Sequence, residues 1–123
     1  MPVIDRPSTP THHLAGAAFT SLATPSHGGA RTSVWSVRLS PGHPPVPHQL
    51  TRGETFIALE GNAVIHLDGV RHEAHAGQMI VVPELTPFSI EAVGGEFEAL
   101  CILPEGGQAV LDGSEPFTPP WAQ

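Results

Sequence analysis

The residues of this sequence best suited to chemistry lie in one stretch, residues 42–61, where a histidine and a carboxylate stand six positions apart. His48 precedes a short polar break, Thr51-Arg52-Gly53, and Glu54 follows it. Such a break turns the chain, so the two side chains can meet across neighbouring strands. An imidazole and a carboxylate so placed suit two kinds of chemistry: coordination of a divalent transition metal, or proton transfer by a paired acid and base.

Glu54 is expected to have hydrophobic neighbours, which make its ionised state costly. It can meet this cost in three ways: by binding a metal, by pairing with a protonated His48, or by taking up a proton through a raised pKa. The second arrangement would leave a His48–Glu54 dyad in an apolar pocket, able to act as a general acid and base. A further interpretation places both side chains in solvent at the mouth of the fold, without a chemical role.

Short strands joined by turns are the elements that must position this pair. Residues 41–47 hold four prolines and form an extended connection, because neither a helix nor a central strand tolerates them. Asp68-Gly69 predicts a two-residue hairpin that pairs Ile65 with His72. Turns are expected at residues 60–62 and 94–95, and residues 79–82 look buried on both faces. Strands are expected at residues 17–22, 32–39, 48–50, 54–59, 63–67, 70–74, 79–82, 88–92 and 96–103.

Composition narrows the classes of function. The chain has 123 residues, enough for one domain, and its 13 glycines and 14 prolines favour an all-β fold. A net charge of −7 without a basic stripe argues against nucleic-acid binding. No apolar run reaches membrane-spanning length and no signal-peptide pattern begins the chain, so a cytoplasmic location is expected. The single cysteine, Cys101, excludes an internal disulfide.

Residues 42–61 and 77–92 resemble the two sequence motifs of the cupin family. The first motif of that family is Gly, five residues, His-x-His, three or four residues, Glu, six residues, Gly, and it is matched here by Gly42, His48, Glu54 and Gly61. The second motif is matched by Gly77 and Pro83. The resemblance implies a cupin-type jelly-roll β-barrel of short antiparallel strands. It also implies one domain over residues 1–123, with its core at about 15–104 and proline-rich arms at 1–14 and 105–123, and a homodimer.

The resemblance breaks at positions that hold metal ligands in the family, which would fall at 48, 50, 54 and 88. Position 50 is a leucine and position 88 a phenylalanine in this chain. His48 and Glu54 alone would bind Mn, Fe, Ni, Zn or Cu weakly unless another side chain assists. The candidates for a further ligand are His72, His43, and His12 or His13.

Hydrophobic residues in place of ligands would make the barrel interior drier and suited to a hydrophobic small molecule. Alternation along the strands directs further apolar side chains to the same interior, although Trp35 and Cys101 fit plain core packing better and Leu50 and Phe88 fit either role. The residues expected to line this pocket are Trp35, Leu50, Phe56, Phe88, Phe97 and Cys101.

Three hypotheses for function follow. The leading one is a small-molecule-binding protein with an apolar pocket and a degenerate metal site, whose partner is a small organic molecule and neither nucleic acid nor membrane. The second is a metal-dependent enzyme of dioxygenase, isomerase or polyketide cyclase type, using His48, Glu54 and one further histidine. The third is a metal-free isomerase that uses the His48–Glu54 dyad. Trp121 is expected to dock the C-terminal arm on its own barrel or on a partner subunit.

Overall fold

The computed structural model describes residues 3–123, which form nine β-strands and one turn of 3-10 helix. All strand pairs are antiparallel, so the predicted all-β class is confirmed for these residues. The elements are β1 (His12–Leu14), β2 (Ala17–Ala23), β3 (Thr32–Leu39), β4 (Gln49–Leu50), β5 (Glu54–Leu67), β6 (Val70–His75), β7 (Met79–Val82), β8 (Phe88–Pro104), β9 (Ala109–Val110) and η1 (Pro120–Ala122). Within residues 3–123 no helix is long and apolar enough to cross a membrane.

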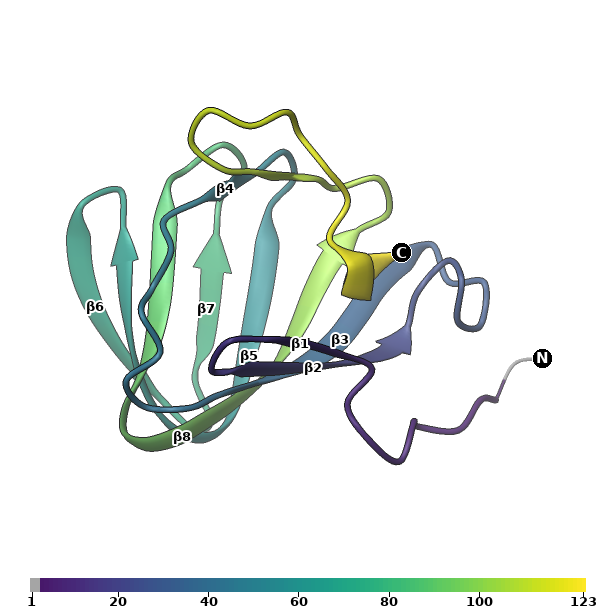
Figure 1. The fold of residues 1–123 in the computed structure, drawn as a ribbon, viewed down its shortest axis with the longest axis horizontal. Helices are drawn as coiled ribbons and strands as arrows, with labels where there is room; N and C mark the ends of the chain where they lie inside the picture. The colour runs from purple at the N-terminus through teal and green to yellow at the C-terminus, as the bar shows by residue number, and fades with distance from the viewer. Residues whose placement is uncertain (1–2) are drawn as a thin grey trace.

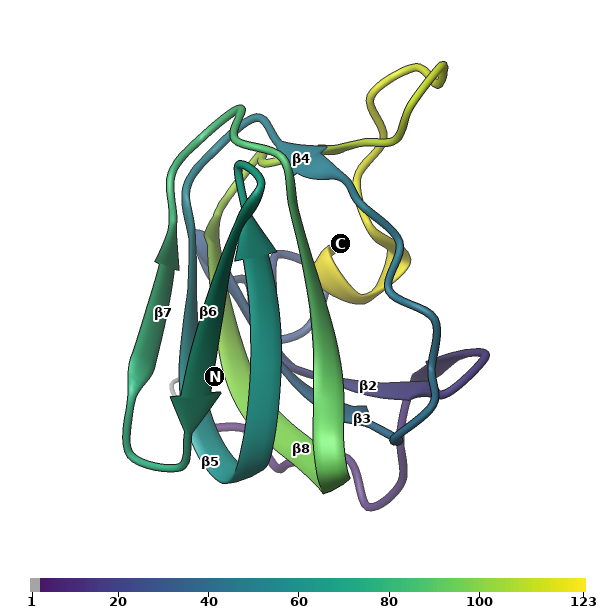
Figure 2. The same ribbon diagram turned by 90° about the vertical axis from the view of Figure 1, so that its left-hand side faces the viewer.

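The long strands β5 and β8 are the spine of the fold, and they pair with each other along most of their length. The main sheet has the strand order β1-β2-β3-β8-β5-β6, and β7 pairs with the start of β5. Both long strands curve, so that β2 and β3 lie on one side of the molecule and β6 and β7 on the other (Figures 1 and 2). The short strands β4 and β9 pair at the upper end, which the C-terminal segment also crosses (Figure 1).

Two predicted turns are instead bends within the long strands, so those two predictions were wrong. The register between β5 and β8 shifts between Ala58 and Glu60 and again between Glu60 and Asn62, which lets β5 curve without ending. Gly61 makes this possible because its φ is +83°, and a Cβ there would overlap the carbonyl oxygen of Glu96. The Gly94-Gly95 pair lies within β8 in the same way.

The strand β7 is not buried on both faces, contrary to the sequence prediction. It pairs with β5 alone among the described strands, and Met79 and Val81 are 62% and 67% exposed. Ile80 and Val82 face inward, and Val82 is fully buried. A run of four apolar residues fits a buried strand and an edge strand equally well, so the sequence did not distinguish them.

The predicted hairpin between β5 and β6 is confirmed, including the pairing of Ile65 with His72. Asp68 and Gly69 both have positive φ, at 50° and 81°, as the tight two-residue turn requires. The interior of the fold is filled by alternate side chains of β2, β3, β5 and β8. This alternation decides which side chains face the candidate site.

A segment near the N-terminus and the C-terminal arm both pack on the barrel. In the N-terminal segment, residues 12–14 form β1 on the edge of β2, although the sequence predicted only an arm there. At the other end, the Trp121 ring stacks on Phe19 with a centroid separation of 3.7 Å and an interplanar angle of 3°. Ser21 Oγ donates a hydrogen bond of 2.8 Å to the carbonyl oxygen of Trp121. The C-terminal arm therefore docks on its own barrel, one of the two arrangements expected.

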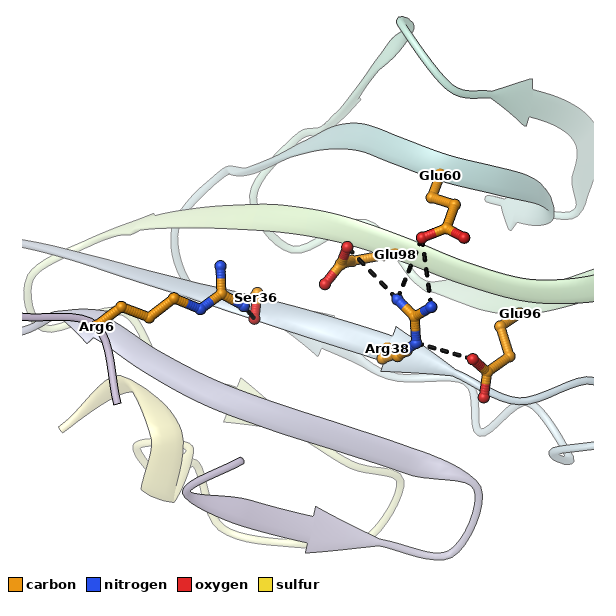
Figure 3. Close-up of polar contacts among 6 residues, drawn as sticks. All are labelled: Arg6, Ser36, Arg38, Glu60, Glu96 and Glu98. Atoms are coloured by element: carbon orange, nitrogen blue, oxygen red, sulfur yellow. Dashed lines mark hydrogen bonds and ion pairs between the residues drawn. The ribbon is translucent and has the colours of Figure 1, made fainter. Parts of the chain in front are cut away.

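The outer face of the sheet carries a charged cluster centred on Arg38 (Figure 3). Its guanidinium group lies 2.8 Å from Glu96, 3.3 Å from Glu60 and 3.5 Å from Glu98. These carboxylates come from β5 and β8, so the arginine links three neighbouring strands. The cluster lies on the opposite face of β3 from the interior and forms no part of the candidate site.

Candidate functional site

A cavity of about 330 Å³ lies inside the barrel, and its walls are mainly hydrophobic. Strands β2, β3, β5 and β8 supply most of the walls, and the proline-rich connection and the C-terminal arm add further lining residues. Four lining residues carry titratable groups: His43, His48, Glu54 and Cys101. Six carry aromatic rings: Phe19, Trp35, Phe56, Phe88, Phe117 and Trp121.

The structure brings together most of the residues that the sequence assigned to the pocket. The cavity is lined by His48 and Glu54 and by five of the six predicted pocket residues, namely Trp35, Leu50, Phe56, Phe88 and Cys101. The sixth predicted pocket residue, Phe97, does not line the cavity, because it lies fully buried in the hydrophobic core. Alternation predicts that Phe97 faces inward, but it does not predict the depth at which the side chain lies.

Sequence reasoning missed the contribution of the chain ends. Phe117 and Trp121 line the cavity because the arm folds back, with Ala109 and Phe117 exchanging backbone hydrogen bonds of 2.7 and 3.0 Å. Phe19 was also missed, although its place in a predicted strand beside the buried Ala17 was a usable signal. The aromatic residues in a proline-rich tail were the corresponding signal for the arm.

Glu54 is the first residue of β5, and it is only 4% exposed. Burial raises its pKa to about 8, and a hydrogen bond with the Cys101 thiol opposes this shift. Burial also raises the pKa of Cys101, and the neighbouring Glu54 raises it further. None of the ion pairs among residues 3–123 includes Glu54. Its carboxyl group is therefore mainly protonated at pH 7 and can donate a hydrogen bond.

His48 is held next to Phe88 by two backbone hydrogen bonds of 3.0 and 2.8 Å, and the two rings lie 4.5 Å apart. Its Nδ1 atom lies 3.0 Å from the carbonyl oxygen of Val46. Because a carbonyl oxygen can only accept, Nδ1 carries the proton and Nε2 is left as an acceptor. Burial lowers the pKa of His48, and the hydrogen bond to Val46 opposes that shift. The imidazole is therefore neutral at pH 7.

The surroundings of His48 and Glu54 together favour one of the interpretations of Glu54 given by the sequence. A protonated His48 paired with an ionised Glu54 does not fit, because the two pKa values move in the opposite directions from those that such a pair requires. Exposure in solvent does not fit Glu54 either, since its side chain is buried. Proton uptake by the carboxyl group is the arrangement that agrees with its surroundings.

The donor set does not fit a metal ion. Leu50 and Phe88 are almost fully buried at the two positions where ligands would be expected. Of the further histidines considered, His43 lines the cavity, whereas His12, His13 and His72 do not. Among residues 3–123, no three side chains of His, Cys, Asp or Glu come together as a possible metal site. His43, which also lines the cavity, has a buried Nδ1 atom without a hydrogen-bond partner.

Solved structures share this arrangement of strands. Salicylate 1,2-dioxygenase from Pseudoaminobacter salicylatoxidans, solved as adducts with gentisate, superposes with a TM-score of 0.72 and 20% identity, over 85% of this chain and 31% of that one. Vicilin from Solanum melongena gives a TM-score of 0.70 and 19% identity, over 85% and 32%. A putative ethanolamine utilization protein from Salmonella typhimurium gives 0.65 and 17%, over 76% of each chain. These similarities confirm the predicted jelly-roll β-barrel.

Comparison of sequences gives a match to one relative over a short stretch, and it also identifies a family. Dimethylsulfoniopropionate lyase of Ruegeria pomeroyi is 42% identical over 43 residues, which are 35% of this chain and 28% of that protein. The chain thus covers about a third or less of the lyase, the dioxygenase and the vicilin. The sequence profile of the cupin domain matches residues 35–103, more than half of the chain, and the chain therefore belongs to the cupin family.

Proposed function

We propose that this cupin binds a small hydrophobic organic molecule inside its barrel. The observation that carries the proposal is the cavity of about 330 Å³ with six aromatic rings in its lining. Ligand pockets typically measure about 300–1,000 Å³ and are lined mainly by hydrophobic and aromatic side chains. Leu50 and Phe88, which replace the family's metal ligands, contribute to this apolar lining.

The proposal can be tested with indane, a rigid hydrophobic bicycle, as a probe. A molecule that binds only the folded state raises the melting temperature in proportion to the logarithm of its concentration, so indane should do so. Leu50→Phe should abolish the effect by filling the cavity, and Leu50→Ala should change the affinity by enlarging it. Leu59→Phe is the matched control, because Leu59 is 46% exposed outside the cavity. A melting temperature that indane leaves unchanged would count against the proposal.

A second candidate function is proton transfer without a metal. It is favoured by the opposite pKa shifts of Glu54 and His48, which leave a protonated acid and a neutral base on one cavity at pH 7. Glu54 would act as the general acid and His48 as the general base of an isomerase. The test is a titration of both groups by NMR; ordinary pKa values for both would exclude this role.

We also propose the homodimer that the family resemblance implies. It is supported by Met79 and Val81, two apolar side chains exposed on the edge strand β7, because exposed apolar side chains that lie together can mark an interaction surface. Val81→Glu should then convert a dimer to a monomer in light scattering. A monomer at all concentrations in the unsubstituted protein would refute the proposal.

A further inference from the structure

The groups that line the cavity also define the chemical class of the ligand, and this step rests on the proposed function. We infer that the cavity selects uncharged organic molecules that carry a hydrogen-bond acceptor, such as a carbonyl oxygen, and that this acceptor binds the carboxyl group of Glu54.

The lining holds no permanently charged cation that could pair with an anionic ligand. None of its residues is an arginine, and the chain contains no lysine. An anionic ligand would therefore leave water without a cation to receive it, which is costly in an apolar cavity. A cationic ligand would gain from the aromatic rings, but it would first require Glu54 to lose its proton. An uncharged ligand requires neither an unpaired charge in the cavity nor the deprotonation of Glu54.

Glu54 is buried against groups that leave its carboxyl group neutral. Its partner residue on β7 is the fully buried Val82, and β8 contributes the thiol of Cys101. The other titratable groups on the cavity are His48, which is neutral, and His43 from the proline-rich connection. A neutral carboxyl group has one O–H donor, and a buried donor gains from a ligand acceptor that replaces water.

The pH dependence of binding distinguishes this arrangement from the alternatives. With a pKa of about 8, about nine-tenths of Glu54 is protonated at pH 7 and about one-tenth at pH 9. Because the ionised form loses only the gain of one hydrogen bond, the affinity for a carbonyl-bearing ligand should fall by about two- to fivefold between these pH values. The affinity for a cation should rise by a similar factor, and that for a plain hydrocarbon should change little. His48 does not interfere, because burial lowers its pKa from the ordinary value and so keeps the imidazole neutral over this range.

The experiment uses four probes of similar shape: indane, 1-indanone, the cation of 1-aminoindane and the anion of indane-1-carboxylic acid. Calorimetric titration at pH 7 should rank 1-indanone first, about three- to tenfold above indane, the gain typical of one hydrogen bond. Glu54→Leu should remove this preference while indane still binds. Glu54→Gln keeps a donor, so it should keep the preference and lose the pH dependence. Glu84→Gln, at an exposed carboxylate, is the control and should match the unsubstituted protein.

The outcomes separate the inference from the function on which it rests. Equal binding of indane and 1-indanone would overturn the inference and leave the binding function standing. Tightest binding of the cation or of the anion at pH 7 would overturn it in the same way and assign a different ligand class. Failure of all four probes to bind would overturn the proposed function and the inference together.

Discussion

Replacing Glu54 by glutamine should stabilise the protein at high pH and have little effect at low pH. Glutamine has nearly the same shape as glutamate, but it cannot ionise. The buried carboxyl group has a pKa of about 8 in the folded protein, against an ordinary value of 4.5. Ionisation of Glu54 therefore destabilises the folded state, and glutamine, which does not ionise, avoids this loss of stability.

The sign and size of this stability difference follow from the linkage between proton binding and folding. Between pH 4.5 and 8 the folded state holds the proton that the unfolded state has lost, so the free energy of unfolding falls as the pH rises. Each unit of pKa difference corresponds to about 1.4 kcal/mol. Glu54 then lowers the free energy of unfolding by about 1 kcal/mol at pH 5, about 3 kcal/mol at pH 7 and about 5 kcal/mol at pH 9.

Urea denaturation of the two proteins at pH 5, 7 and 9 measures this difference. The change from pH 5 to pH 9 is the decisive quantity, because it cancels any fixed cost of burying the amide. Glu84→Gln provides the control at an exposed site and should give a constant difference. If Glu54→Gln changed the free energy of unfolding equally at all three pH values, the carboxyl group would not be held neutral by burial.

Three further substitutions test the fold around the cavity. Gly61→Ala should destabilise the protein by more than about 2 kcal/mol in chemical denaturation, because it combines a positive φ with an overlap on the Glu96 carbonyl oxygen; wild-type stability would refute the bend in β5. Trp121→Ala should lower stability by about 2 kcal/mol through loss of its stacking on Phe19. It should also speed the dissociation of indane in stopped-flow measurements. An unchanged dissociation rate would show that the arm does not control access to the cavity. Arg38→Ala should change stability by less than about 1 kcal/mol, an effect that high salt should reduce, since this ion-pair cluster is solvent-exposed; a large effect insensitive to salt would contradict that description.

The sequence predicted which residues share the cavity, because the constraints on them are local. The break at residues 51–53 lies between β4 and β5, and it leaves His48 and Glu54 on the same cavity. The alternation of side chains along a strand was enough to direct Trp35, Phe56 and Cys101 inward. These predictions needed no information from distant parts of the chain.

The errors concern features that depend on distant contacts. The bend of β5 at Gly61 depends on the close approach of Glu96, which is far away in sequence. The exposure of β7 depends on its place at an edge, and the residues of the strand do not reveal that place. Phe117 reaches the cavity only because a proline-rich tail folds back over the barrel. No local pattern specifies where such a tail returns.

The attachment of that tail has a consequence for motion. Its first part is held by the two-residue pairing of β9 with β4 and by the bridge between Ala109 and Phe117, whereas β5 and β8 are joined along most of their length. Segments with few contacts open at a lower free energy than the strands at the centre of a fold. Amide hydrogen exchange at Ala109 and Phe117 should therefore be faster than in β8, and a bound molecule should slow it. The C-terminal segment would then set how quickly a ligand enters and leaves, while the barrel itself stays closed.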